Sequence, residues 1–214
     1  MINMRIAGRG TVPAGEYDKV SLSGSGRLFG EVHCNNFSAA GRSSGESITC
    51  AERFKASGSS SFSGTVKAQN VRAAGSFSCG GDLVAEEELS VSGSLRVGGD
   101  LQAASVRIAG GLVCDGALCA KETELQADTE MRLERIAGGN IRVRRKLISI
   151  FRKRRVRVTT AIEGDVLDLE YAIAPRVTGR NIIIGKGCEI DLVQYRDEIQ
   201  ISPKATVGKV EKFE

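Results

Sequence analysis

The sequence has no tryptophan and only one histidine among its 214 residues, and aromatic residues make up 5% of it. The lone histidine, His33, lies between Val32 and Cys34, so strand alternation is expected to turn it toward solvent. Most general-base schemes and catalytic triads need a histidine in a prepared site. The sequence therefore predicts no catalytic residues, and we do not expect an enzyme.

Metal and cofactor signatures are also missing. Six cysteines are present, but they form no CxxC pair and no Cys/His pair with zinc spacing. No P-loop occurs, and the glycines of Gly24-x-Gly26-x-x-x-Gly30 do not have the spacing of a dinucleotide-binding loop. We therefore expect no metal and no cofactor, and we interpret most of the cysteines as small buried residues.

Long hydrophobic runs are absent, since no apolar stretch approaches the ~18 residues of a membrane-spanning helix. The first residues, Met1 to Arg5, lack the apolar stretch of a secretory signal. The sequence is therefore expected to belong to a cytoplasmic protein.

What the sequence does contain is a repeat, in which three series keep step at an interval of about 17 residues. The first series consists of the glycines Gly24, Gly41, Gly58, Gly75, Gly93 and Gly110. The second places a small residue two positions after an apolar one, at Cys34, Cys50, Ala68, Ala85, Ala103 and Ala120. The third is apolar and contains Val20, Phe37, Phe54, Val71, Leu89 and Val106, with Leu125 expected next. Self-similarity at a fixed period indicates stacked structural repeats.

The length of the repeat indicates whether the stacked units are built from helices or from strands. About 17 residues are too few for two packed helices, whereas alternation such as Leu95-Arg96-Val97 is typical of strands with one buried face. We therefore predict an all-β, single-stranded parallel β-helix, or β-solenoid, with a triangular cross-section and about 17 residues per coil. Glycines would form its corners, and the small series would stack in a narrow interior column. A flexible Gly/Ser linker is the alternative, but a linker has no reason to keep this register.

Four segments follow from these patterns. We expect residues 1–15 to form an N-terminal tail or cap and residues 16–125 to form the regular β-helix. Residues 126–158 are expected to be irregular and to include a basic amphipathic stretch. Residues 159–214 read as a looser continuation of the β-helix, with strand patterns interrupted by glycines.

The strongest charge anomaly is residues 142–157, which contain nine lysines and arginines and no acid. Its apolar centre would share one face of a helix, and the flanking cations would suit an anionic lipid surface. The segment also reads as strands packed in the coil, or as a nucleic-acid contact. The candidate contact residues are Arg144, Arg145, Lys146, Leu147, Ile148, Ile150, Phe151, Arg152, Lys153, Arg154 and Arg155.

Two stretches resemble a known family, namely Gly15-Glu-Tyr-Asp-Lys-Val-Ser-Leu-Ser-Gly-Ser-Gly26 and Gly93-Ser-Leu-Arg-Val-Gly-Gly-Asp-Leu101. They are similar to the first coil and to later coils of the bactofilins, polymer-forming bacterial cytoskeletal proteins. The resemblance covers mainly residues 15–125. It implies a right-handed β-helix that polymerises end to end without nucleotide, often at the inner face of the cell membrane, with roles in cell shape or motility.

The function expected from these observations is a structural cytoskeletal protein that forms homopolymers. Its partners would be copies of itself, other bactofilin-like chains, or the cytoplasmic face of the membrane. The alternative is a module that binds nucleic acid or another anionic polymer through residues 142–157. That segment has one aromatic residue and so offers no platform for stacking bases, and nucleic acid is not the expected partner.

Overall fold

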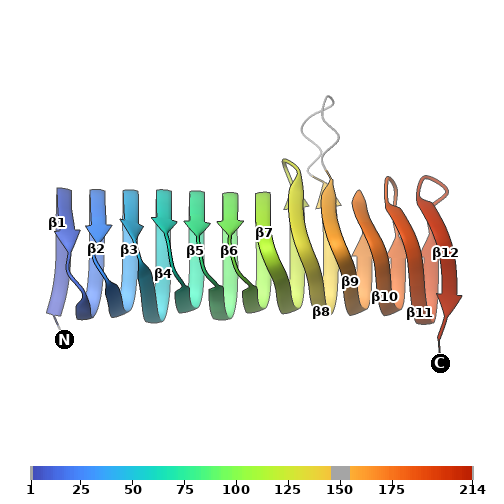
Figure 1. The fold of residues 1–214 in the computed structure, drawn as a ribbon, viewed down its shortest axis with the longest axis horizontal. Helices are drawn as coiled ribbons and strands as arrows, with labels where there is room; N and C mark the ends of the chain where they lie inside the picture. Colours follow the sequence, from blue (N-terminus) through green and yellow to red (C-terminus); the bar gives the residue numbers. More distant parts are fainter. Residues whose placement is uncertain (1, 146–154, 214) are drawn as a thin grey trace. The chain divides into compact units, whose positions relative to one another are not determined.

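The structure is a computed structural model that describes residues 2–145 and 155–213. Over these residues all regular secondary structure is β-strand, and there is no helix that could cross a bilayer. The chain is a β-solenoid, in which each strand pairs in parallel with the next and one coil takes one repeat of the sequence (Figure 1). It divides into two compact units, Met1–Ala104 and Ser105–Glu214, and each is described by itself.

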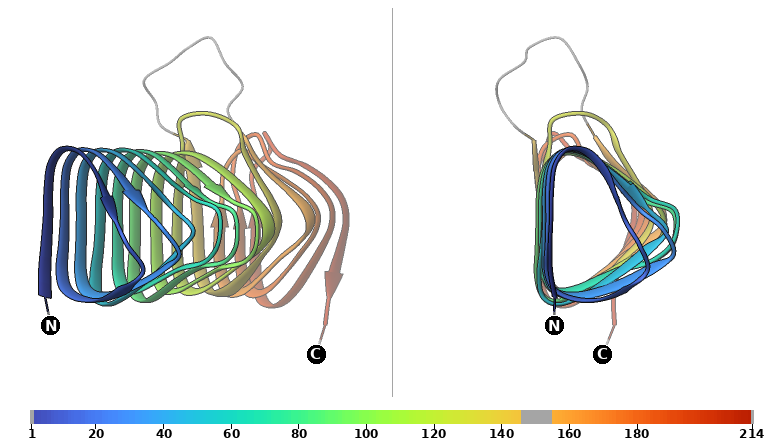
Figure 2. Two further views of the ribbon diagram at one scale, coloured as in Figure 1. Left: turned by 60° about the vertical axis from the view of Figure 1, so that its left-hand side comes forward. Right: turned by 90° about the vertical axis from the view of Figure 1, so that its left-hand side faces the viewer.

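Unit 1 is the regular repeat. It contains β1 (Ile2–Val12), β2 (Gly15–Leu28), β3 (Glu31–Gly45), β4 (Ser47–Phe62), β5 (Val66–Cys79), β6 (Leu83–Val97) and the start of β7 (Leu101–Ala127). Each of these strands bends around corners. In the right view of Figure 2 the chain of unit 1 runs clockwise around a triangular outline as it recedes from the N-terminus, so the coil is right-handed.

Residues 1–15 do not form the expected tail or cap. Residues 2–12 are strand β1, which pairs with β2 in continuous register from Asn3 to Val12. Gly8 pairs with Gly24, so the glycine series begins one coil earlier than the sequence suggested. The inward positions of β1 include Met4, Ile6 and Val12, although the sequence pattern here is weaker than in the following coils.

The corner glycines stack directly on one another. Gly24, Gly41, Gly58, Gly75 and Gly93 form one column of paired residues. All have positive φ, as does Gly110, which lies in unit 2. A Cβ on Gly58 would lie 2.3 Å from the carbonyl oxygen of Gly41. The corner therefore requires glycine for its backbone conformation and for the close approach of successive coils.

The interior of unit 1 contains a column of aromatic rings. Phe37 and Phe54 are stacked with their centroids 4.9 Å apart, and Phe54 stacks on Phe77 at 5.3 Å. Phe62 packs edge-on against Phe54 at 5.6 Å. Four of the seven phenylalanines of the chain are thus in one fully buried cluster.

The small series also lies inside the coil. Cys34, Cys50, Ala68 and Ala85 pair in successive strands and are buried. Ala103 is half-buried, and Ala120, in unit 2, is buried and pairs with Gly138. The Sγ atoms of Cys34 and Cys50 lie 3.5 Å apart, and this contact together with burial raises the pKa of Cys50. Burial likewise raises the pKa of Cys79 to about 11, so Cys50 and Cys79 stay protonated and behave as apolar core residues.

Unit 2 contains the rest of β7, then β8 (Met131–Arg145), β9 (Val156–Leu169), β10 (Ala172–Ile184), β11 (Glu189–Ile201) and β12 (Thr206–Lys212). Residues 131–145 were expected to be irregular, but they form β8, which pairs with β7 and β9. The strands after residue 159 are also parallel and in register, with local shifts.

One inward position of unit 2 is polar. Thr123, not the expected Leu125, lies one repeat after Val106, and it pairs with Ile141 of β8. Thr123 is 3% exposed, and its Oγ1 has no hydrogen-bond partner in the described part of the chain. Leu125 is buried two positions further along. The third series therefore continues through a threonine, which an apolar pattern does not detect.

Replacing Thr123 by valine is expected to raise the free energy of unfolding by about 1–2 kcal/mol, because a buried hydroxyl without a partner loses its hydration without compensation. Urea unfolding followed by circular dichroism measures this change. The exposed Thr65 provides the control, since Thr65→Val should change stability by less than ~0.5 kcal/mol. An unchanged or lower stability of Thr123→Val would show that the hydroxyl is satisfied in solution.

Candidate assembly edges

The last coil of unit 2 has a backbone edge with no strand partner among the described residues. Residues 198–201 pair with residues 181–184 of β10, and β12 pairs with residues 189–195 of β11. On the other side, neither stretch pairs with a strand of the described chain. A free edge of this kind presents N–H and C=O groups that can accept another strand. We call residues 198–212 the C-terminal edge.

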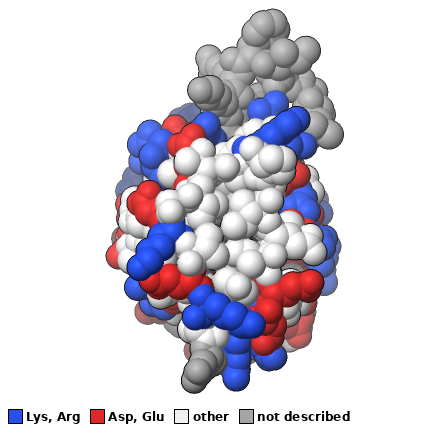
Figure 3. Space-filling model, turned by 90° about the vertical axis from the view of Figure 1, so that its right-hand side faces the viewer, with Lys and Arg blue, Asp and Glu red and all other residues white. Residues whose placement is uncertain are grey.

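The interior is open at this edge. Val193 is 0% exposed, whereas Val210, its partner on β12, is 43% exposed. Ile184 is likewise 0% exposed, and its partner Ile201 is 41% exposed. Figure 3 looks at this side of the molecule and shows an uncharged centre surrounded by charged side chains. The core positions of the last coil are therefore presented to solvent inside a charged rim.

The first coil of unit 1 presents a second free edge. Strand β1, which we call the N-terminal edge, pairs with β2 and with no other strand of the residues that the structure describes. Ile2 is 69% exposed, and the inward residues Met4 and Ile6 are only half-buried. Strand β1 contains two arginines, Arg5 and Arg9, and no acidic residue. This edge is therefore apolar inside and positively charged outside.

The flanks of the basic segment are engaged within the fold. Arg144 donates hydrogen bonds to both carboxylate oxygens of Asp168, one of them at 2.8 Å, and this contact raises the pKa of Arg144. Nη1 of Arg155 lies 2.5 Å from Oε1 of Glu189. The guanidinium of Arg145 lies 4.9 Å from the ring centroid of Tyr171.

Of the candidate contact residues, the three that the structure describes thus already have partners in unit 2. The others lie outside the described residues, namely Lys146, Leu147, Ile148, Ile150, Phe151, Arg152, Lys153 and Arg154. Asp168 and Glu189 lie a full coil or more beyond their arginine partners in the sequence, so no local charge pattern could have indicated these pairs.

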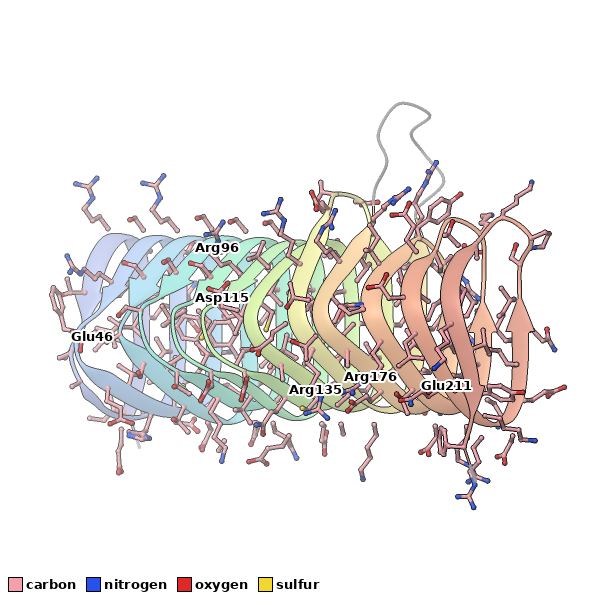
Figure 4. All side chains as sticks on the ribbon, turned by 45° about the vertical axis from the view of Figure 1, so that its right-hand side comes forward. Glu46, Arg96, Asp115, Arg135, Arg176 and Glu211 are labelled. Atoms are coloured by element: carbon pink, nitrogen blue, oxygen red, sulfur yellow. The ribbon has the colours of Figure 1, made fainter. Side chains whose placement is uncertain are left out.

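The outer faces of unit 2 carry charges that balance one another. Glu163 accepts from Arg135 and lies 3.4 Å from Arg176, and Figure 4 shows these two arginines projecting on the same side. Further along, Arg180 and Asp197 are 3.0 Å apart. Exposed pairs of this type contribute little stability, but they leave small net charge on the sides of the unit.

A groove of about 360 Å³ on unit 2 also contains charges of both signs. It is lined by residues of β7, β8 and β9, and along it charge alternates from Glu124 to Arg142 to Asp168, which pair in successive strands. Across the described ranges no three His, Cys, Asp or Glu side chains are grouped to hold a metal ion. His33 is exposed and lies 3.4 Å from Glu31.

The sequence interpretation did not identify the edge residues as a site, although the repeat period contains a signal for them. Ile199 and Ile201 lie one repeat after Ile182 and Ile184, and Val207 and Val210 follow Ile190 and Val193 in the same way. The period thus marks these residues as inward. That no strand of the described residues covers them is visible only in the structure.

The comparisons with known proteins add two partial similarities. Over 81 residues the chain is 31% identical to the uncharacterized protein YhbF of Bacillus subtilis (strain 168), which covers 38% of this chain and 34% of YhbF. Over 66 residues it is 36% identical to the uncharacterized protein YhbE of the same organism, covering 30% of the chain and 28% of YhbE. The matches therefore span about a third of these relatives. No protein-family model and no solved structure matches the chain.

Proposed function

We propose that this chain is a structural protein that assembles end to end with copies of itself, without nucleotide, in the manner of the bactofilins that its repeat resembles. The observation that supports the proposal is the uncovered core of the terminal coils. Val210 and Ile201 occupy core positions and yet are 43% and 41% exposed. Covering them with another coil would bury apolar side chains and pair a free strand edge in one step.

The same proposal places the protein in the cytoplasm and gives it a role in cell shape or motility. Membrane association would be a further property, and it would depend on residues 146–154 because the described flanking arginines are engaged elsewhere. Those pairs also weigh against the alternative of an anionic-polymer module. Arg144 and Arg155 would have to leave Asp168 and Glu189 in order to contact phosphates.

Val210→Asp is expected to abolish assembly, because it places a carboxylate at the centre of the apolar surface that a second copy would cover. Val166→Asp provides the matched control. Val166 is also 43% exposed, but it lies on the outward face of β9 and away from the edge. Electron microscopy and sedimentation velocity should show filaments or large oligomers for the parent and for Val166→Asp, and monomers for Val210→Asp.

The proposal fails if the parent chain stays monomeric at high concentration and at several salt concentrations. It also fails if Val210→Asp assembles as well as the parent. Circular dichroism of Val210→Asp checks that the β-solenoid is retained. Since the side chain is already 43% exposed, we expect little loss of stability.

A further inference from the structure

Two cysteine thiols of unit 1 lie against each other in adjacent coils. Cys34 of β3 and Cys50 of β4 are paired residues, and their Sγ atoms are 3.5 Å apart. Paired residues of neighbouring strands have Cα atoms about 4.8 Å apart, which is within the range that a disulfide spans. Both side chains are buried, and both cysteines are free. A disulfide between the coils would therefore need a closer approach of the two sulfur atoms but no change in strand register.

The backbone beside this pair is irregular. The register between β3 and β4 shifts directly after Cys34 and Cys50, because β4 has two residues, Ala51 and Glu52, where β3 has only Asn35. A bulge of this kind interrupts the hydrogen-bond ladder locally and increases the twist of the strand. We expect it to give the two cysteines the small freedom that is needed to bring their sulfur atoms to the bonding distance of about 2.05 Å.

A cavity of about 250 Å³ on unit 1 has Cys34 in its wall. Its lining also includes the buried Tyr17 and the exposed residues His33 and Ala51. A water molecule takes up about 30 Å³ in the liquid, so the cavity has room for a molecule as small as hydrogen peroxide. Cys34 is therefore the thiol of the pair that we expect a small oxidant to meet first.

The contact between the thiols makes them unequal in acidity. A hydrogen bond from the Cys50 thiol lowers the pKa of Cys34, although burial acts in the opposite direction. The same contact and burial raise the pKa of Cys50. Because the thiolate is the reactive form of cysteine, Cys34 is the better nucleophile of the two. Cys50 keeps its proton and is available for a second step.

We propose that Cys34 and Cys50 form a redox site, in which a small peroxide oxidises the two thiols to a disulfide that links β3 to β4 and stabilises unit 1. The site lies within unit 1, and it does not depend on the proposed assembly.

The reaction has two steps, and hydrogen peroxide is the oxidant. Sγ of Cys34 first attacks one peroxide oxygen, the O–O bond breaks, and the departing hydroxide forms water with the proton that Cys34 releases. Sγ of Cys50 then attacks the sulfenic acid sulfur of Cys34, so that the S–S bond forms and the S–O bond breaks. The second hydroxide leaves as water with the proton of Cys50. The two thiols together lose two electrons, which the peroxide gains.

The disulfide would close a loop between residues that are 16 positions apart. Closing such a loop restricts the unfolded chain and so stabilises the folded one. We expect the oxidised protein to unfold at a urea concentration about 1 M higher than the reduced protein. Dithiothreitol should return the midpoint to its original value, because it breaks the bond again.

Peroxide treatment followed by peptide mapping tests the site. The background carries Cys119→Ser, because Cys119 is the exposed native cysteine of the described chain. The folded protein is treated with a small molar excess of hydrogen peroxide, its remaining thiols are alkylated in urea, and it is digested with trypsin without reduction. Cleavage after Arg27, Arg42 and Arg53 places the two cysteines on separate peptides. We expect residues 28–42 and 43–53 to be joined, with a mass lower than their sum by two hydrogen atoms, and no covalent dimer of the chain.

Cys79 and Cys188 are the internal controls. Both are buried, and their thiols donate to the backbone carbonyl oxygens of Gly64 and Leu169. We expect the thiols of Cys34 and Cys50 to be lost at least about tenfold faster than those of the two controls. Equal rates, or a disulfide that joins any other pair of cysteines, would overturn the proposal.

Two alanine variants assign the steps. Ala68 and Ala85 occupy the same column in the next coils, so alanine should fit at either cysteine, and circular dichroism checks the fold. In Cys50→Ala the sulfenic acid of Cys34 has no thiol to condense with and should proceed to sulfinic acid. In Cys34→Ala we expect Cys50 to remain a thiol, and peroxide should not raise the urea midpoint of either variant. Intact thiols in the treated parent, or a disulfide form with an unchanged midpoint, would refute the redox site.

Discussion

Replacing Phe54 by alanine is expected to lower the free energy of unfolding by about 3–5 kcal/mol. Phe54 is 0% exposed and packs against Phe37, Phe77 and Phe62 with ring centroids 4.9–5.6 Å away. Removing the central ring leaves a cavity between rings that the parallel strand pairs on both sides hold in place. The surrounding coils therefore have little freedom to close the gap, which places the cost at the upper part of the range.

Urea unfolding of an assembly-deficient background, Val210→Asp, measures this loss without a contribution from filaments. Phe29→Ala is the control, because Phe29 is 46% exposed and contacts the Arg27 guanidinium at 4.9 Å from its ring centroid. Its replacement should cost less than about 1 kcal/mol. A loss below about 1 kcal/mol for Phe54→Ala would mean that the aromatic column repacks around the missing ring.

Gly58→Ala is expected to destabilise unit 1 by about 3 kcal/mol or more. Gly58 has a φ of 107°, a conformation that side chains with a Cβ rarely adopt, and this alone costs ~1–3 kcal/mol. The added Cβ would also lie 2.3 Å from the carbonyl oxygen of Gly41, so the backbone of two coils must separate. The corner cannot relax locally, because Gly75 stacks on Gly58 from the other side.

Gly8→Ala separates the cost of the backbone conformation from the cost of the contact between the added Cβ and the neighbouring coil. Gly8 belongs to the same column and has a φ of 89°, but a Cβ there would meet no atom of the described chain within 4 Å. Its replacement should cost only the conformational part, ~1–2 kcal/mol. Thermal unfolding of both variants in the Val210→Asp background gives the comparison. Equal losses would show that the contact between coils contributes nothing.

The expected losses for Phe54→Ala and Gly58→Ala both depend on the close fit between neighbouring coils. The proposed assembly depends on the same fit. Each coil is fitted closely to its neighbours, so a coil with one neighbour has inward side chains that are only partly covered. Met4 and Val210 are two such side chains. A stacked repeat usually covers its terminal coils with a polar cap. Neither edge has such a cap among the described residues, which is why a second copy is the partner we propose.

Several features could be read from the sequence because they are local and repeated. The glycine spacing, the small series and the alternation at Leu95-Arg96-Val97 follow from the geometry of one coil, and they recur at each turn. The prediction of a parallel β-solenoid with one sequence repeat per coil is confirmed, and the coil has the right hand that the resemblance implied. The prediction of a tail at residues 1–15 was wrong, as was the expectation that residues 131–145 are irregular, because these coils keep the register with different residues.

The sequence by itself determined the period, and with it the fold and the inward or outward direction of most side chains, because a strand alternates faces and a coil repeats them. Only the tertiary structure decided that Thr123 is buried without a partner, that Arg144 and Arg155 bind acids far away in the chain, and that Val210 lies uncovered. Each of these depends on which side chains of neighbouring coils meet. A period specifies how one coil follows another, but it does not specify those contacts.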